Sequence, residues 1–209
     1  MNLVQTDTDL FYWINQHHCT ASDWVLWVAS QSWSWAVVLL LAITFTTLRH
    51  EPHRWWLVLL GIALCFLIAD RTSVYIKYLV CRPRPCHALE GVRMFHTSCG
   101  GEYGFVSSHA ANVFALAMFL VLRYRKILTR SRLLHNVLPH NRYHHLLFPI
   151  LMFLWAVVVA YSRPYLGKHY PGDVICGGLL GLAIGMIVFL IMQLIEKLTH
   201  YAIKRKKVA

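Results

Sequence analysis

The chain has 209 residues, 57% of them hydrophobic, and a mean hydropathy of +0.49, which is too apolar for an ordinary soluble domain. Its 20 lysines and arginines exceed its 9 aspartates and glutamates and give a net charge of +11. Because the basic residues lie mostly between apolar runs, this charge favours an anionic lipid surface or an anionic substrate over nucleic acid as the partner.

The first 23 residues predict a segment that lies at the membrane interface. The stretch Asp9–His18 mixes aromatic and polar residues, as amphipathic helices at a bilayer surface do. A cleaved signal peptide is not expected, because Asp7 and Asp9 stand where such peptides are basic and the apolar run starts late.

Five apolar segments follow, and most reach the length of about 20 residues that a helix needs to cross a bilayer. In chain order they are Trp24–Leu48, Trp55–Val80, Phe105–Tyr124, Leu146–Ser162 and Val174–Ile195. We therefore predict an all-α integral membrane bundle of about five to six transmembrane helices, the sixth being a crossing near residues 9–30. No linker or internal repeat divides the sequence, so residues 1–209 are expected to form a single domain.

The basic residues predict the orientation of this bundle. In a five-span arrangement, the loops at 49–54 and 123–145 and the C-terminal tail share one side and carry 13 of the 20 lysines and arginines. That side is expected to be cytoplasmic, because cytoplasmic loops are enriched in basic residues. The other seven contradict this trend by lying in the outer half: Arg71, Lys77, Arg82, Arg84, Arg93, Arg163 and Lys168.

Two polar motifs flank the loop between the second and third segments. The first, KYLVCRPRP, places Lys77 and Arg84 at the end of the second segment, where Pro83 and Pro85 end the helix. Two neighbouring cations repel each other unless an anion with several charged oxygens lies between them, and phosphate suits the guanidinium fork of arginine.

The second motif, FVSSHAAN, opens the third segment. Ser107 and Ser108 stand at its predicted N-cap, where free backbone amides and the helix dipole favour an anion, and His109 falls in the first helical turn. The third motif, YSRPYLGKHYPGD, joins the fourth and fifth segments and adds a third cation, Arg163. All three motifs reach the same membrane surface.

His169 and Asp173 are spaced i, i+4, and they face each other if Pro171 opens the fifth helix. A carboxylate on one imidazole nitrogen fixes the tautomer and leaves the other nitrogen as a nucleophile. His109 would then donate a proton to the leaving oxygen. Two histidines, an acid and three cations constitute a phosphoryl-transfer site that needs no metal.

These residues resemble the three signatures of the type 2 phosphatidic acid phosphatase family, which also includes the vanadium haloperoxidases. K-x6-R-P matches Lys77, Arg84 and Pro85, and S-R-x5-H-x3-D matches Ser162, Arg163, His169 and Asp173. P-S-G-H is half kept, as Val106, Ser107, Ser108 and His109.

The resemblance implies that the catalytic motifs lie within residues 77–173 and that His169 becomes transiently phosphorylated. It implies that Asp173 supports His169 and that His109 protonates the leaving group. It assigns the phosphate to Lys77, Arg84, Ser107, Arg163 and the amide of Ser108. No metal and no cofactor are implied.

The resemblance is to small bacterial members that act on membrane lipid phosphates, with the site at the outer face of the cytoplasmic membrane. We expect undecaprenyl diphosphate as the substrate, and lipid A or phosphatidylglycerophosphate as the alternatives. A non-catalytic lipid-binding or haem-binding membrane protein is the alternative of another class. The sequence does not fix the oligomeric state.

Asp70 and two cysteines carry further hypotheses. Asp70 lies seven residues before Lys77, on nearly the same helix face, and is either a buried partner for Arg71 or a neighbouring helix, or a support for Lys77. Cys86 and Cys99 bracket a loop that faces an oxidising compartment in this orientation, which makes a disulfide a hypothesis. The remaining outer cations, Arg71, Arg82, Arg93 and Lys168, are expected to be interfacial anchors.

Overall fold

The computed structural model describes residues 2–44, 55–134 and 143–206 of the chain. The described residues form the helices α1 (Leu3–Gln16), α2 (Thr20–Ser30), α3 (Ser32–Ile43), α4 (Trp55–Val80), α5 (Pro85–Ala88), α6 (Ser108–Leu134), α7 (Tyr143–Tyr165) and α8 (Pro171–Lys206). Among them the only β-type pairing is an isolated bridge between Pro83 and Tyr103. The predicted all-α class is confirmed.

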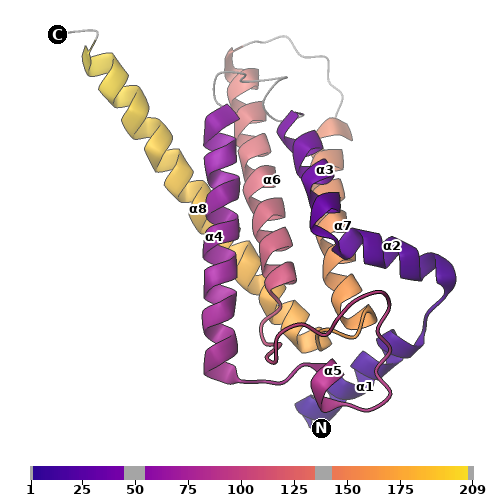
Figure 1. Ribbon diagram of the computed structural model, residues 1–209. Helices are drawn as coiled ribbons and strands as arrows, with labels where there is room; N and C mark the ends of the chain where they lie inside the picture. The colour runs from indigo at the N-terminus through magenta and orange to yellow at the C-terminus, as the bar shows by residue number, and fades with distance from the viewer. Residues whose placement is uncertain (1, 45–54, 135–142, 207–209) are drawn as a thin grey trace.

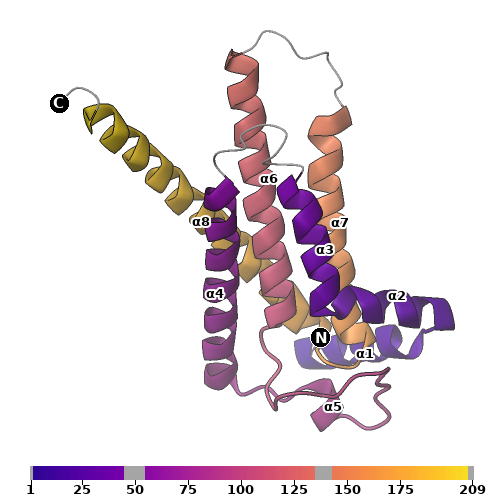
Figure 2. The ribbon, with the colours of Figure 1, turned by 45° about the horizontal axis from the view of Figure 1, so that its top comes forward.

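Helix α6 is the centre of the bundle, with α4, α7 and α8 packed around it and α3 alongside (Figures 1 and 2). The end of α4, the start of α6, the end of α7 and the start of α8 meet at one end, which we call the polar end. Helices α1 and α2 lie across that end. Phe11, Ile14 and Asn15 of α1 are buried there, so the predicted interfacial segment is a helix docked on the bundle.

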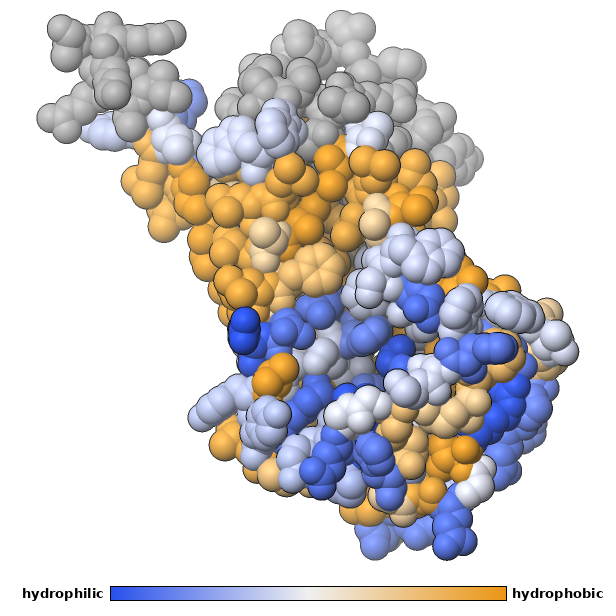
Figure 3. Space-filling view, viewed as in Figure 1, coloured by the Kyte–Doolittle hydropathy of each residue, from blue (hydrophilic) through white to orange (hydrophobic). Residues whose placement is uncertain are grey.

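Apolar side chains cover the bundle above the polar end, and hydrophilic residues gather at that end (Figure 3). Many leucines and isoleucines of α7 and α8 are exposed, among them Leu147, Ile150, Leu154, Leu179 and Leu190. A surface so apolar fits lipid rather than water. Within the described residues, three helices are long and apolar enough to cross a membrane: α4, residues Leu146–Tyr165 of α7, and residues Pro171–Tyr201 of α8.

Helix α6 is less apolar than these three, because its first turn is polar and Arg123 and Arg125 follow its apolar middle. Its middle is buried against protein, as at Leu116 and Leu120, so it needs little lipid-facing surface. The helix also continues to Leu134. The expectation of a loop from residue 123 is therefore wrong for the described residues 123–134.

The first predicted span, Trp24–Leu48, is not one straight helix. Helices α2 and α3 meet at Gln31 with a bend of 68°, and residues 45–48 lie outside the described part of the chain. The Ser34 hydroxyl donates to the Gln31 carbonyl at 2.7 Å, and the Trp35 indole donates to the Ala29 carbonyl at 2.9 Å, so side chains replace the helical bonds that the bend removes. The bent pair counts as at most one span, so the part of the chain that the structure describes contains three or up to four candidate spans.

The suggested sixth crossing near residues 9–30 is wrong as a single helix. Helix α1 ends at Gln16 and α2 begins at Thr20, and the two lie along the polar end rather than through the bundle. Ser22, three residues beyond the N-cap Cys19, bonds to the Cys19 backbone amide at 3.1 Å and so supports a fresh helix start at this position.

Close packing of α6 on α8 sets the geometry of the polar end. A Cβ atom at Gly181 would lie 2.3 Å from the Ala111 carbonyl oxygen, and one at Gly185 would lie 2.4 Å from that of Ala115. Only glycine permits this approach, as small residues do in membrane helix pairs. As a result the Ser107 amide reaches the Asp173 carbonyl at 3.0 Å, which joins the starts of the two helices.

Candidate active site

A cavity of about 530 Å³ opens near the polar end, between α3, α4, α6 and the α7–α8 connection. Six of the eight predicted site residues line it: Lys77, Arg84, Ser108, His109, Arg163 and His169. The rest of its wall comes from Ser32, Trp35, Ala36, Leu39, Phe66, Asp70 and Asn112. The structure therefore brings the three sequence motifs together around one space.

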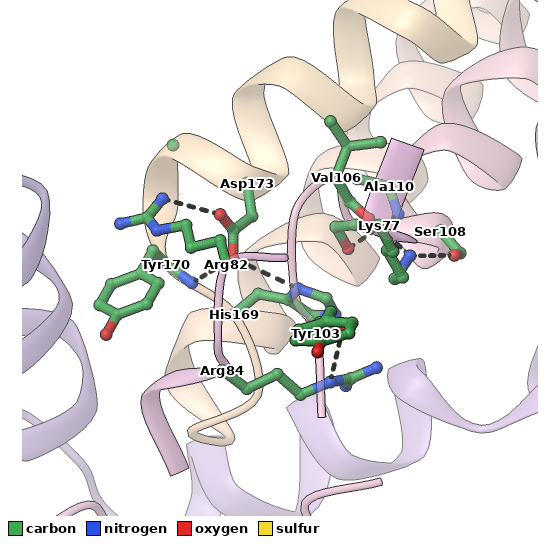
Figure 4. A network of polar contacts seen from close by, with 12 residues as sticks. Lys77, Arg82, Arg84, Tyr103, Val106, Ser108, Ala110, His169, Tyr170 and Asp173 are labelled. Atoms are coloured by element: carbon green, nitrogen blue, oxygen red, sulfur yellow. Dashed lines mark hydrogen bonds and ion pairs between the residues drawn. The ribbon is translucent and has the colours of Figure 1, made fainter. Parts of the chain in front are cut away.

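Lys77 is buried near the end of α4 and donates to the Val106 carbonyl and to the Ser108 hydroxyl, both at 2.6 Å (Figure 4). These bonds tie α4 to the chain that leads into α6. The helix ends directly after, because Cys81 adopts a left-handed conformation with φ 52° and prolines follow. The short exit carries Arg84 back to the cavity.

Arg84 is held by backbone carbonyls of the 86–104 loop. Its Nε donates to the Tyr103 carbonyl at 3.2 Å and its Nη1 to the Cys99 carbonyl at 3.3 Å. Burial lowers the pKa of its guanidinium, although an arginine remains cationic at neutral pH. Both bonds leave part of the guanidinium fork available to an anion in the cavity.

A disulfide joins Cys86 to Cys99, with the two Cα atoms 5.9 Å apart, so that sequence hypothesis is confirmed. It closes the loop whose Cys99 carbonyl holds Arg84. His87 lies near the same two sulfur atoms. Because the sulfurs are bonded to each other, they do not provide the thiolates that a metal would require.

Arg163 provides the deepest cation of the site. Its residue is 3% exposed, and its Nε has no hydrogen-bond partner within the described part of the chain. A buried guanidinium without a full set of partners is costly unless an anion binds to it. The position of Arg163 in the cavity wall is the arrangement expected for a phosphate contact.

His169 and Asp173 face each other, as predicted, and Pro171 opens α8 between them. The His169 Nδ1 lies 3.5 Å from Asp173 Oδ2, a close approach that is longer than a hydrogen bond. Burial lowers the pKa of His169 well below its ordinary value, and the charges of Arg163 and Arg84 add to this effect. The imidazole is therefore neutral at physiological pH, as a nitrogen nucleophile must be.

His109 lies in the first turn of α6 and shares the cavity with His169. Its ring packs against Trp35 of α3, with the ring centroids 5.1 Å apart. The site thus contains two imidazoles at one surface of the bundle. Asp173 stands behind His169, fully buried and outside the cavity wall.

Ser107 differs from its predicted role. Its hydroxyl accepts the Ala110 amide at 3.4 Å, as an N-cap does, and the residue is fully buried outside the cavity wall. The phosphate contact expected of its side chain is therefore not supported. Ser108 does line the cavity, but its hydroxyl already bonds Lys77.

Sequence reasoning missed several residues of this site. Arg82, predicted to be an interfacial anchor, instead donates to Asp173 at 2.8 Å. Asn112 and the α3 residues of the wall were not predicted at all, although Asn112 follows His109 by one helical turn. Asp70 lines the same cavity as Lys77 and is exposed, so it is not the buried partner that one of the two hypotheses expected.

Known proteins resemble this chain in both sequence and fold. The lipid A 4'-phosphatase of Bacteroides thetaiotaomicron is 30% identical over 187 residues, which cover 86% of this chain and 73% of the relative. That of Porphyromonas gingivalis is 28% identical over 194 residues, covering 90% and 73%. The crystal structure of a transmembrane PAP2-type phosphatidylglycerolphosphate phosphatase from Bacillus subtilis matches with a TM-score of 0.64 at 22% identity, over 94% of this chain and 88% of that one.

The family model described as PAP2 superfamily matches residues 54–197, a range that contains all three motifs. The fold, the membrane-spanning helices and these matches agree. The chain belongs to the PAP2 superfamily, and it is a membrane phosphatase.

Proposed function

We propose that this protein hydrolyses a phosphomonoester on a membrane lipid through a phosphohistidine. The His169 Nε2 forms a bond to phosphorus while the bond from phosphorus to the lipid oxygen breaks. His109, held as the imidazolium by the negative charge of the bound phosphate group, gives that oxygen its proton. Water then attacks the phosphohistidine, His109 takes up a proton from the water, and inorganic phosphate leaves. The observation that carries this proposal is the single cavity that both imidazoles share with Lys77, Arg84 and Arg163.

The three cations take the part that divalent metals play in other phosphoryl-transfer enzymes. Charge on the equatorial oxygens of the transferring group is stabilised by donors that are already in place. Arg84 is fixed by two carbonyls, and Lys77 by a carbonyl and a hydroxyl, so their placement needs little rearrangement. In this mechanism no metal or cofactor takes part.

The lipid is proposed to be a saccharolipid of the lipid A kind. The two relatives described above, each covered over 73% of its length, are named as lipid A 4'-phosphatases. The cavity adds a physical argument. Asp70 lies seven residues from Lys77 on α4, about 10 Å further into the bilayer at 1.5 Å per residue, and Asn112 lies beyond His109 on α6.

These polar groups lie where the part of a substrate between its phosphate and its tails would rest. A sugar with hydroxyl and amide groups offers hydrogen-bond donors there, whereas a polyprenyl diphosphate offers only hydrocarbon next to the Asp70 carboxylate. Burying a carboxylate against hydrocarbon is unfavourable. Trp35, Leu39 and Phe66 provide an apolar wall for the lipid chains. We therefore place undecaprenyl diphosphate second among the candidates.

We further propose that the site faces the outside of a bacterial cytoplasmic membrane, with the C-terminus on the cytoplasmic side. Arg123, Arg125 and Lys126 of α6 and Lys197 of α8 lie in the halves of these helices away from the polar end, which supports this orientation. The Cys86–Cys99 disulfide at the polar end also supports it, because disulfides persist in oxidising compartments.

Phosphate release in detergent from a panel of lipids tests these proposals. The panel holds lipid A, phosphatidylglycerophosphate and undecaprenyl diphosphate, and the variants are His169→Ala and Asp70→Asn. We expect release from lipid A by the wild type, no release by His169→Ala, and a lower preference for lipid A over undecaprenyl diphosphate in Asp70→Asn. Unchanged turnover by His169→Ala would reject the nucleophile, and loss of wild-type turnover with EDTA would reject the metal-free mechanism.

A further inference from the structure

Three charged residues from separate parts of the chain form a row behind the nucleophile. Arg82 donates from Nη2 to Asp7 Oδ2 at 2.7 Å and from Nη1 to Asp173 Oδ1 at 2.8 Å (Figure 4 shows the bond to Asp173). The Arg82 guanidinium also lies 3.9 Å from the centre of the Tyr170 ring. We call this row, Asp7–Arg82–Asp173, the carboxylate clamp.

We infer that Arg82, held by Asp7, is a positioning residue for the His169 nucleophile. Its contact fixes one oxygen of the Asp173 carboxylate, while the Tyr170 amide donates to the other oxygen at 3.1 Å. With both oxygens held, the carboxylate cannot rotate, and Oδ2 remains directed at His169 Nδ1, 3.5 Å away. This inference rests on the proposed roles of His169 and Asp173.

The negative charge of Asp173 is a second reason why the contact with Arg82 is needed. The Asp173 side chain is fully buried, and a buried carboxylate needs a cation and hydrogen bonds to offset the loss of water. The Arg82 side chain is 24% exposed and spans the distance from the protein surface to this carboxylate. Loss of Arg82 would leave the carboxylate without its cationic hydrogen-bond donor, next to the imidazole that it must orient.

Asp7 extends the clamp to α1. Its side chain accepts both the Arg82 guanidinium and, at 2.7 Å, the Gly172 amide at the start of α8. A carboxylate at this position also suits the positive end of the α8 dipole. The docked N-terminal helix is thereby connected to the nucleophile through two ion pairs and not only through apolar packing.

The pair between Arg93 and Asp23 provides a matched control. Arg93 belongs to the same polar-end loop region and donates to Asp23 of α2 at 2.9 and 2.5 Å, so it too ties that region to an N-terminal helix. It lies outside the cavity wall, and none of its hydrogen bonds reaches His169 or Asp173. Substituting Arg93 therefore removes a comparable ion pair between this region and an N-terminal helix without changing any contact of the nucleophile.

The test compares purified Arg82→Gln, Asp7→Asn, the double variant and Arg93→Gln, each normalised to folded protein by its melting transition. We expect kcat for phosphate release to fall about tenfold in Arg82→Gln with KM changed less than about threefold, because the clamp acts on the nucleophile and not on phosphate binding. In Asp7→Asn, kcat should fall several-fold. In the double variant kcat should fall no further than in Arg82→Gln, since both residues act through the same row of ion pairs. In a rapid-quench experiment, phosphoenzyme should form more slowly in Arg82→Gln. Arg93→Gln should keep its kcat.

Three results would overturn the inference: an unchanged kcat in folded Arg82→Gln, an effect on KM alone, or an equal loss in Arg93→Gln. His169→Ala is included so that failure of the proposed function can be told apart from failure of the inference about the clamp. If His169→Ala retains turnover, the proposed function is wrong. If it is inactive while Arg82→Gln is fully active, only the clamp is wrong. Arg82→Lys provides a second variant in case Arg82→Gln does not fold, and is expected to recover part of the lost kcat.

Discussion

The indole of Trp35 lies nearly perpendicular to the imidazole of His109, with the ring centroids 5.1 Å apart and an interplanar angle of 79°. Trp35 is itself buried, and its indole N–H is held by the Ala29 carbonyl at the bend between α2 and α3. The break in the first predicted span therefore places an aromatic wall against the proposed proton donor.

Shortening Trp35 should impair protonation of the leaving group. In Trp35→Leu the side chain remains apolar but the ring contact is lost, so His109 gains freedom to leave its position. We expect kcat to fall about tenfold, and Trp35→Phe to retain most of it, because an edge-to-face pair is preserved. Trp33→Leu is the control, since Trp33 belongs to the same helix and is 59% exposed. Equal kcat losses at positions 33 and 35 would contradict this role.

Opening the Cys86–Cys99 disulfide should weaken substrate binding more than it slows the chemical step. The Cys99 carbonyl holds Arg84, and a freed loop would release that guanidinium. We expect the Cys86→Ser, Cys99→Ser double variant to show a KM raised several-fold and a lower melting temperature, with a free-energy loss of up to about 3 kcal/mol from loop entropy. Cys19→Ser, at an exposed free cysteine, is the control. An unchanged KM would show that the loop holds Arg84 without the disulfide.

Adding a side chain at Gly181 should separate α6 from α8. The added Cβ atom would meet the Ala111 carbonyl at 2.3 Å, which neither helix backbone is free to avoid. We expect Gly181→Ala to lower stability by about 1–3 kcal/mol, the usual cost of overpacking, and to lower activity with it. Thermal unfolding in detergent measures this loss. Gly101→Ala should be neutral, because no atom lies within 4 Å of its added Cβ atom, and a neutral Gly181→Ala would contradict the packing argument.

The acid limb of the pH–rate profile should respond to Arg84. Positive charge from Arg84 helps to lower the pKa of His169. His169 therefore stays neutral and reactive at pH values below the ordinary histidine pKa of about 6.5. Removing the charge in Arg84→Gln raises the pKa of His169, so phosphoenzyme formation should begin to fail at a higher pH than in the wild type. Arg84→Lys keeps a charge and should keep the limb near its wild-type position, although its KM rises because the guanidinium fork is lost. An acid limb that does not move in Arg84→Gln would contradict this prediction.

Much of the catalytic arrangement could be predicted from the sequence, because the residues involved lie close together within short motifs. Lys77 and Arg84 lie within one motif, and the i, i+4 spacing of His169 and Asp173 needs only a helix that starts at Pro171. The apolar lengths of α4, α7 and α8 are equally local, and their predicted positions agree with the structure.

The remainder depends on contacts between distant parts of the chain, for which no local signal exists. The partnership of Arg82 with Asp7 joins residues 75 positions apart, and each looks like an ordinary interfacial charge in isolation. The bend at Gln31 was hidden because both of its flanks are apolar, so composition alone predicted one long span. The position of Ser107 outside the cavity wall could not be predicted, because a serine that caps a helix and one that binds phosphate occupy the same sequence position.

The carboxylate clamp also has a consequence for biosynthesis. Asp7 and Arg82 leave the ribosome before Asp173, which follows only after α7 has been made, so Arg82 must wait for Asp173 before the clamp is complete. A growing chain therefore holds every phosphate-binding cation before it acquires a correctly oriented nucleophile. Catalytic competence should arise only when α8 inserts and α1 closes over its start.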